Sequence, residues 1–231
     1  MNDSFRAEIF APVETWVFDL DNTLYPPASR LFDQVSGRMT KFIVEHFDLD
    51  PDTARVKQKD LFKRHGTTMR GLMVEHGIDP NVFLDYVHSI DVGSIDANPS
   101  LGKRLGLLPG SKLIFTNASR GHAERVLGQL GIAPHFEEIF DISKADYVPK
   151  PDRATYAAML ERHQVSAANA CMVEDMAVNL KMAKELGMAT VWLRGEIDWA
   201  QPEGQLSEAS YIDYAADDLG SWLDLVIASR S

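Results

Sequence analysis

The chain has 231 residues, of which 45% are apolar and 25% are charged, and its formal net charge is −11. These values are typical of a folded protein with one large domain or two small ones. The acidic balance argues against a broad grip on DNA or RNA, which needs clustered Lys and Arg, but it permits a small anionic substrate. The one cysteine, Cys171, excludes an internal disulfide, and no apolar run approaches the ~20 residues of a membrane span. Because residues 1–12 lack a long apolar core, we expect no signal peptide and a cytoplasmic protein.

The first predicted strand covers Trp16, Val17 and Phe18, an apolar run that is typical of a strand buried on both faces. Asp19 and Asp21 follow it directly, and ligands bind at the carboxyl ends of strands in an open α/β sheet. Buried carboxylates need a cation or hydrogen bonds for compensation. The pair therefore predicts a site for a hard divalent cation, with one carboxylate available as a nucleophile. The alternative is that both residues only cap a turn.

A helical region follows the first strand. Apolar residues recur at helical spacing between residues 31 and 47, and helix start signals at Pro51 and Pro80 introduce further helices, with a short helix before His76. Four helices with no strand among them predict an all-α insert. We therefore expect a helical cap domain over residues 25–94, with residues 1–24 and 95–231 forming the other domain.

After Pro99 the predicted strands and helices alternate. Four further apolar runs predict strands at residues 112–115, 138–141, 170–173 and 190–193, each apart from the last followed by a helical pattern. Such strand–helix units predict a parallel, doubly wound α/β sheet. Residues 196–214 are polar and irregular, and residues 219–227 resemble a closing helix.

Polar side chains of different types follow these strands. The carboxyl ends of parallel strands share one edge of a sheet, so these side chains are expected to converge. Carboxylates, a hydroxyl and a lysine form a consistent set for phosphoryl transfer, with Mg²⁺ bound by carboxylate oxygens. The residues are Asp19, Asp21, Thr116, Asn117, Lys150, Glu174 and Asp175.

This set resembles the four motifs of the haloacid-dehalogenase superfamily of phosphohydrolases. The first motif, Asp-x-Asp-x-Thr, matches Asp19, Asp21 and Thr23, and the second, a Ser or Thr at a strand end, matches Thr116. The third, a lysine, matches Lys150. The fourth, an acidic pair followed by a polar residue, matches Glu174, Asp175 and Asn179.

The resemblance implies a role for each residue that matches a motif. Asp19 would be the nucleophile, and Asp21 would protonate the leaving alkoxide and later activate water. Mg²⁺ would bind Asp19, the carbonyl of Asp21 and Asp175, with Glu174 acting through water. An aspartate at position 21 favours a phosphatase over a dehalogenase, because a halide leaving group needs no proton.

The same resemblance assigns phosphate binding. Thr116 and Lys150 would hold the phosphate, and Lys150 would also ease the repulsion between Asp19 and Asp175. Asn117 would lend its backbone N–H, while Asn179 would orient the metal loop. The helical insert looks like the family's cap, which closes over the site and selects the substrate.

A finer resemblance is to the pyrimidine 5′-nucleotidase branch, which removes phosphate from UMP- and CMP-type monophosphates. It rests on residues 18–25, residues 66–72 with their Arg-Gly-Leu, and residues 115–119 with His122 and Ala123. Two positions depart modestly from the pattern: Glu174 stands where Asp is also common, and Met176 stands where a small polar residue is frequent.

For some residues near these motifs, the sequence permits two interpretations. Arg70 reaches the substrate phosphate or ribose, or it is a solvated surface residue. Asn22 and Tyr25 touch the substrate, or they pack the loop beside the nucleophile. We expect His122 to cap or pack at the start of its helix, and Cys171 to be a buried small hydrophobe rather than a nucleophile.

Several functions remain open on the sequence alone. The leading hypothesis is a Mg²⁺-dependent pyrimidine 5′-nucleotidase acting through an aspartyl-phosphate. The alternatives are a phosphatase for sugar phosphates, phosphoglycolate or phosphoserine, and a phosphomutase. A phospho-accepting signalling domain would not explain Asp21 or the insert, and an inactive binding module should have lost a motif residue. The expected partner is a small phosphomonoester, and a homodimer formed through exposed apolar cap residues is left open.

Overall fold

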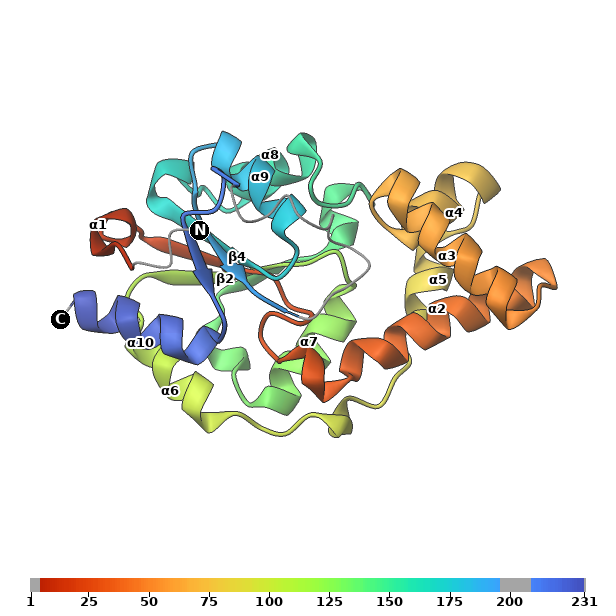
Figure 1. The fold of residues 1–231 in the computed structure, drawn as a ribbon, viewed down its shortest axis with the longest axis horizontal. Helices are drawn as coiled ribbons and strands as arrows, with labels where there is room; N and C mark the ends of the chain where they lie inside the picture. Colours follow the sequence, from red (N-terminus) through yellow and green to blue (C-terminus); the bar gives the residue numbers. More distant parts are fainter. Residues whose placement is uncertain (1–4, 196–208, 231) are drawn as a thin grey trace.

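A parallel six-stranded sheet lies at the centre of the molecule, in the computed structural model that describes residues 5–195 and 209–230. The strand order is β3-β2-β1-β4-β5-β6 (Figure 1). The order changes direction between β1 and β4, and in open α/β sheets ligands bind at such a switch point. The strands are β1 (Thr15–Phe18), β2 (Ser111–Phe115), β3 (Glu138–Phe140), β4 (Ala170–Glu174), β5 (Ala189–Leu193) and β6 (Tyr214–Ala216).

Helices cover both faces of this sheet (Figure 1). Successive side chains of a strand point to opposite faces, so Trp16 and Phe18 pack into one apolar cluster while Val17 packs into the other. The first cluster includes residues of α1 (Ala7–Phe10), α6 (Pro99–Leu107), α7 (Arg120–Leu130) and α10 (Leu219–Ser229). The second includes residues of α8 (Arg153–Arg162) and α9 (Ala177–Glu185). The central strands are therefore buried from both sides, as their continuous apolar runs predict.

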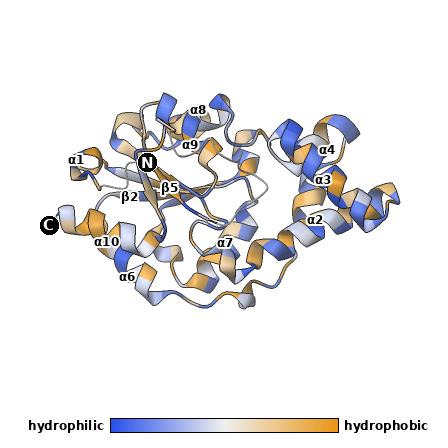
Figure 2. Cartoon of the chain, in the orientation of Figure 1, coloured by the Kyte–Doolittle hydropathy of each residue, from blue (hydrophilic) through white to orange (hydrophobic). Residues whose placement is uncertain are grey.

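Four helices without a strand form a separate lobe, here called the cap (Figure 1). Its helices mix hydrophilic and hydrophobic residues (Figure 2), and their apolar side chains form a cluster of their own. Asp50 caps the second helix by accepting hydrogen bonds from the backbone N–H groups of Asp52 and Thr53, and Gly66 ends that helix at φ 80°. The cap helices are α2 (Leu31–Phe47), α3 (Pro51–His65), α4 (Thr68–His76) and α5 (Pro80–Val87).

The cap contacts the sheet domain at a short 3₁₀ helix, η4 (Ile142–Ala145), which follows β3. Ile142 is 1% exposed and packs into the apolar cluster of the cap. Close by, the Tyr147 hydroxyl donates a hydrogen bond of 2.7 Å to Asn81 Oδ1. Gly66 lies against the loop before α8, because a β-carbon there would stand 3.6 Å from Pro149 Cγ. The turn between α3 and α4 is thereby held near Lys150.

The predicted fold class, a doubly wound parallel sheet with a helical insert, is confirmed. Two short elements, α1 and β6, were not predicted, because four-residue and three-residue segments carry little periodicity. Most of the segment expected to be irregular, residues 196–208, lies outside the described residues, and Tyr214 at its end begins β6. The boundaries of a cap domain at residues 25 and 94 remain a prediction. No helix in the described ranges has the length and apolar character needed to cross a membrane.

Candidate active site

The ends of three neighbouring strands bring the predicted residues together. Asp19 follows β1, Thr116 follows β2, and Glu174 is the last residue of β4. Because β1 pairs with both β2 and β4, the three strand ends are adjacent. The backbone continues this pairing one residue past β1, where the Asp19 N–H donates to the Val173 carbonyl at 2.9 Å. The sheet therefore fixes the position of the Asp19 backbone through hydrogen bonds between strands.

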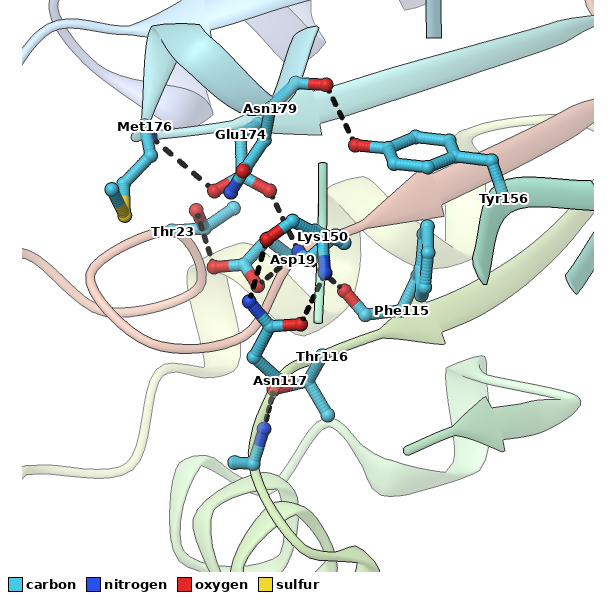
Figure 3. A network of polar contacts seen from close by, with 11 residues as sticks. Asp19, Thr23, Phe115, Thr116, Asn117, Lys150, Tyr156, Glu174, Met176 and Asn179 are labelled. Atoms are coloured by element: carbon cyan, nitrogen blue, oxygen red, sulfur yellow. Dashed lines mark hydrogen bonds and ion pairs between the residues drawn. The ribbon is translucent and has the colours of Figure 1, made fainter. Parts of the chain in front are cut away.

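Lys150 is the centre of the buried polar network at this edge (Figure 3). Its Nζ donates to Asp19 Oδ1 at 2.8 Å, to Glu174 Oε2 at 2.7 Å and to the Phe115 carbonyl at 2.8 Å. All three donor positions of the ammonium are used. Burial lowers the pKa of Lys150, but Asp19 and Glu174 raise it by more, so the net shift is upward and the group stays charged.

Asp19, Glu174 and Asp175 form a cluster of buried carboxylates. One oxygen atom from each lies within 4.8 Å of the others. Burial and the negative charge of Glu174 raise the pKa of Asp19 to about 7, although Lys150 opposes the shift. Burial, Glu174 and Asp19 likewise raise the pKa of Asp175 well above its usual range. One lysine cannot neutralise three carboxylates, so the site favours a further cation.

This donor set fits a hard divalent cation such as Mg²⁺. The ligand atoms are all oxygens, and Mg²⁺ prefers carboxylates together with water and phosphate oxygens. The loop that carries Asp175 is anchored, because the indole N–H of Trp192 donates to the Asp175 carbonyl at 2.9 Å. Glu174 is held on both sides, by Lys150 and by the Met176 N–H, which donates to Oε1 at 3.3 Å. Asp19, Glu174 and Asp175 are thus the residues that could hold the metal.

Asn117 has a structural task that the sequence did not reveal. Its Oδ1 accepts a hydrogen bond of 2.9 Å from the backbone N–H of Lys150, and its Nδ2 donates to the Lys150 carbonyl at 3.5 Å. These two hydrogen bonds hold the backbone of Lys150, whose side chain contacts Asp19. Thr116 Oγ1 accepts from the Ala118 N–H at 3.0 Å, which shapes the turn after β2. A role for the backbone N–H of Asn117 in phosphate binding stays a prediction.

Asp21 sits in a different set of contacts from Asp19. Its Oδ1 accepts a hydrogen bond of 2.6 Å from the Tyr25 hydroxyl and lies 2.9 Å from His122 Nε2. Burial raises the pKa of Asp21, but His122 and Tyr25 lower it by more, so the net shift is downward. The carboxyl groups of Asp19 and Asp21, two positions apart in sequence, therefore have pKa values moved in opposite directions.

The other residues predicted to contact the substrate, Tyr25, Asn22 and Arg70, differ in their burial and in their contacts. Tyr25 is buried, and its hydroxyl is engaged by Asp21. Asn22 has a left-handed backbone at φ 60°, a conformation that asparagine tolerates better than most residues. Arg70 lies in the first turn of α4, and its side chain makes no hydrogen bond or ion pair within the described residues. Contact of these three residues with substrate stays a prediction.

Two histidines beside Asp21 were not predicted as part of the site. His122 lies in the first turn of α7, where its backbone N–H donates to the capping hydroxyl of Ser119 at 3.4 Å. Its ring is buried and faces Asp21, and His88 stacks on it with ring centroids 4.4 Å apart. The sequence signal that could have placed His122 in the site was its position, because α7 begins five positions after the end of β2 and its first turn therefore lies beside the sheet edge.

Comparison with known proteins defines the class of the chain. The family model for haloacid dehalogenase-like hydrolases matches residues 13–187, which is most of the chain. The chain therefore belongs to the haloacid dehalogenase-like hydrolases, and the superfamily resemblance of its motifs is confirmed.

Similar proteins agree with this membership. Phosphate metabolism protein 8 of Saccharomyces cerevisiae is 27% identical over 196 residues, which cover 77% of this chain and 60% of that protein. A phosphoglycolate phosphatase of Vibrio parahaemolyticus is 30% identical over 118 residues, which cover 50% of this chain and 49% of that enzyme. The chain thus spans about half to three fifths of the length of these curated relatives.

Solved structures share the fold. A haloacid dehalogenase-like family hydrolase from Streptococcus pneumoniae matches with a TM-score of 0.60 at 17% identity, over 95% of this chain and 99% of that one. A HAD phosphatase from Thermococcus onnurineus also matches with a TM-score of 0.60, at 16% identity, over 93% of this chain and 98% of that one. The L-2-haloacid dehalogenase of Xanthobacter autotrophicus gives 0.56 at 15% identity, over 93% and 98% of the two chains. At these identities the likeness concerns the fold alone.

Proposed function

We propose that this protein is a Mg²⁺-dependent phosphomonoester hydrolase that works through an aspartyl-phosphate on Asp19. The observation that carries the proposal is the buried network in which Lys150 joins Asp19 to Glu174, beside the carboxylate of Asp175. A nucleophilic carboxylate, a fixed cation and a cluster that fits a divalent metal are the parts that phosphoryl transfer requires. These parts meet at the sheet edge where ligands bind in folds of this kind.

In the first step of the proposed reaction, a carboxylate oxygen of Asp19 attacks the phosphorus of the ester. The bond between phosphorus and the ester oxygen breaks, and the phosphoryl group is transferred to Asp19. Lys150 fixes the orientation of Asp19 through Oδ1, and Thr23 Oγ1 donates to Oδ2 at 3.3 Å. Asp19, Glu174 and Asp175 would hold Mg²⁺, which would neutralise negative charge as the dianionic phosphate approaches the carboxylate.

In this proposal, Asp21 donates a proton in the first step and accepts one in the second. It gives a proton to the departing alkoxide and then accepts one from the water that attacks the aspartyl-phosphate, which regenerates Asp19 and releases phosphate. In the free protein the lowered pKa keeps Asp21 ionised. A bound phosphate dianion is a like charge close to Asp21, and such a charge raises the pKa of a carboxyl group. Substrate binding itself thereby lets Asp21 hold the proton that the leaving group needs.

The presence of an acid–base residue at position 21 also supports a phosphatase over a dehalogenase. An alkoxide is a poor leaving group without a proton, whereas a halide needs none. General acid–base assistance of this kind is worth roughly 10²–10⁴-fold in rate. The chain has Asp21 in contact with Tyr25 and His122, a set of contacts that a halide leaving group would not require.

For the substrate, we propose pyrimidine 5′-monophosphates such as UMP and CMP. The support is the resemblance of residues 18–25, 66–72 and 115–119 to that branch of the family. The α3–α4 turn lies against Pro149, so the segment with Arg70 belongs to the part of the cap nearest Lys150. Phosphoglycolate is the second candidate, because Vibrio phosphoglycolate phosphatases are 30% identical over half of the chain.

The experiment is a phosphate-release panel with the purified full chain. Nucleoside monophosphates, phosphoglycolate, sugar phosphates and phosphoserine are compared by kcat/KM, each with Mg²⁺ and with EDTA. We expect metal-dependent release, with UMP and CMP among the best substrates. A best substrate outside the nucleotides would overturn the nucleotidase assignment and leave the hydrolase assignment standing. Absence of release from every ester would overturn both.

A further inference from the structure

The His122 side chain is fully buried between Asp21 and His88. A carboxylate can only accept hydrogen bonds, so Nε2 must carry the hydrogen in the 2.9 Å contact with Asp21 Oδ1. The other ring nitrogen, Nδ1, is buried and has no hydrogen-bond partner among the described residues. Buried polar atoms are rarely left unpaired. Within the part of the chain that the structure describes, the hydrogen bond of this ring is therefore the one to Asp21, and a purely structural histidine would be expected to satisfy both nitrogens.

The contacts of Asp21 are confined to one oxygen. Tyr25 and His122 both approach Oδ1, at 2.6 Å and 2.9 Å, so within the described residues Oδ2 is the oxygen without a hydrogen-bond donor. Two donors on one oxygen fix the rotation of the carboxyl group about its terminal bond. They also leave Oδ2 as the atom that can carry and deliver a proton. The rotation of Asp21 is thus set by Tyr25 and His122.

His88 holds the ring of His122 from the side of the cap. It follows α5 directly, at the point where the chain leaves the cap helices. Its ring stacks on His122 with an interplanar angle of 17°, and its Nδ1 lies 2.8 Å from Ser119 Oγ, the hydroxyl that caps α7. Arg125 of α7 donates to the His88 carbonyl. Burial lowers the pKa of His88 to about 3, so the stacked ring is neutral.

From this geometry, and resting on the hydrolase activity proposed above, we propose that His122 is a positioning residue for Asp21. Its Nε2–H, together with the Tyr25 hydroxyl, turns Oδ2 of Asp21 toward the leaving-group oxygen. His88 keeps the His122 ring in place and ties this arrangement to the end of the last cap helix. The cap is thereby connected to the acid–base residue through two stacked imidazoles.

The test compares His122→Gln with His122→Met. The two side chains have similar length and shape, but only glutamine has an amide N–H to place near Asp21. Each variant is assayed on UMP, whose leaving group is an alkoxide, and on p-nitrophenyl phosphate, whose weakly basic phenolate leaves without a proton. The measured quantity is kcat/KM, which reports the steps up to the first phosphoryl transfer. His163→Met is the matched control, because His163 is half-buried against Phe140 at the end of α8.

We expect His122→Met to lower kcat/KM for UMP by about 10- to 100-fold, which is the loss expected when a catalytic group is misplaced. The same substitution should lower kcat/KM for p-nitrophenyl phosphate far less. His122→Gln should recover most of the loss, and His163→Met should show none. An equal fall on both esters, no fall on UMP, or no recovery with glutamine overturns the inference while the hydrolase proposal stands. A wild-type protein that releases phosphate from no ester of the panel described above overturns both.

A second variant covers the case in which His122→Met does not fold. His88→Phe keeps a stacked ring but removes the hydrogen bond to Ser119. It should lower kcat/KM for UMP by about 3–10-fold and lower kcat/KM for p-nitrophenyl phosphate by less. Equal effects on the two esters in this variant overturn the inference in the same manner. Thermal unfolding followed by circular dichroism identifies the variants that are folded.

Discussion

The sheet edge and the cap are organised by different forces. At the sheet edge, buried charged groups from three separate segments are held by direct hydrogen bonds, and Lys150 alone joins residues that lie 131 and 24 positions away. The cap is four consecutive helices around an apolar cluster, with its ion pairs on the exposed surface, as between Lys41 and Glu45. The charges at the sheet edge are each held by hydrogen bonds to other buried groups, whereas the cap contacts the sheet domain through apolar packing at Ile142 and through hydrogen bonds such as those of Tyr147 and His88.

The difference indicates a division of tasks. In the proposed reaction, phosphoryl transfer needs charges that are fixed before the substrate arrives, and the hydrogen-bonded groups of the sheet edge meet this need. We propose that the cap recognises the rest of the substrate, because its surface can change without disturbing these charges. Substitutions at the sheet edge should therefore change catalysis or stability strongly, and substitutions in the cap should change substrate preference.

The largest effect is expected for Asp19→Asn, which removes the proposed nucleophile. Phosphate release should fall by at least about 10⁴-fold in kcat, a size typical of the loss of a nucleophile. Asp141→Asn is the matched control, because Asp141 also follows a strand but its side chain accepts from Ser143 at 2.7 Å, outside the carboxylate cluster. Measurable turnover by Asp19→Asn, or a similar loss in both variants, would contradict the assignment.

The next largest effect is on stability, through Lys150→Met. The substitution leaves Asp19 and Glu174 buried without their common partner, and breaking a buried ion pair in this way costs about 3–5 kcal/mol. Urea unfolding in EDTA measures the loss. Lys41→Met in the cap should change the free energy of unfolding by less than about 0.5 kcal/mol, since its partner is exposed. Similar losses in the free energy of unfolding for the two variants would contradict the proposed difference between the sheet edge and the cap.

A smaller effect is expected on the thermal stability of the protein, which should depend on pH and on Mg²⁺. The pKa of Asp19 is about 7 in the folded chain and ordinarily 3.8, so the folded state keeps a proton that the unfolded chain releases. Its contribution to stability is present at low pH and is lost as the pH rises through about 7. In EDTA the Tm should therefore fall by roughly 5 °C between mildly acidic and mildly alkaline pH, and the rise in Tm on adding Mg²⁺ should grow over the same range.

Asp19→Asn provides the check on this pH dependence. The amide does not titrate, so the variant without metal should be more stable than wild type at alkaline pH and nearly equal to it at acidic pH. Differential scanning calorimetry across the pH range measures both. An unchanged pH profile in the variant would show that another group is responsible.

The smallest effect is expected in the cap. Arg70→Ala should raise KM for UMP several-fold, because the proposed contact with the phosphate or ribose is lost, while kinetics with an aryl phosphate stay close to wild type. Arg55→Ala, an exposed arginine on α3, is the control. Equal losses on the nucleotide and the aryl phosphate would exclude a specific role for Arg70.

Most of the fold and the members of the carboxylate cluster were predictable from the sequence. Buried strands appear as apolar runs, and amphipathic helices appear as a period near 3.6, because burial on two faces or one face constrains local composition. The polar residues directly after Phe18 and Phe115 and at the end of β4 could be placed at one edge, because parallel strands share their direction. Cys171 was expected in a buried strand, and it lies buried in β4.

The residues that end the strands and the segments that form helices follow from the local sequence, since both depend on neighbours along the chain. The hydrogen bonds of the Asn117 side chain to the Lys150 backbone and the stacking of His122 and His88 beside Asp21 arise from the packing of the folded chain. Asn117 and His122 reach partners 33 and 101 positions away, and they do so through the direction in which a side chain leaves its helix or turn. Sequence spacing does not encode that direction, because it is set by how α7 packs on the sheet and how the chain returns from the cap.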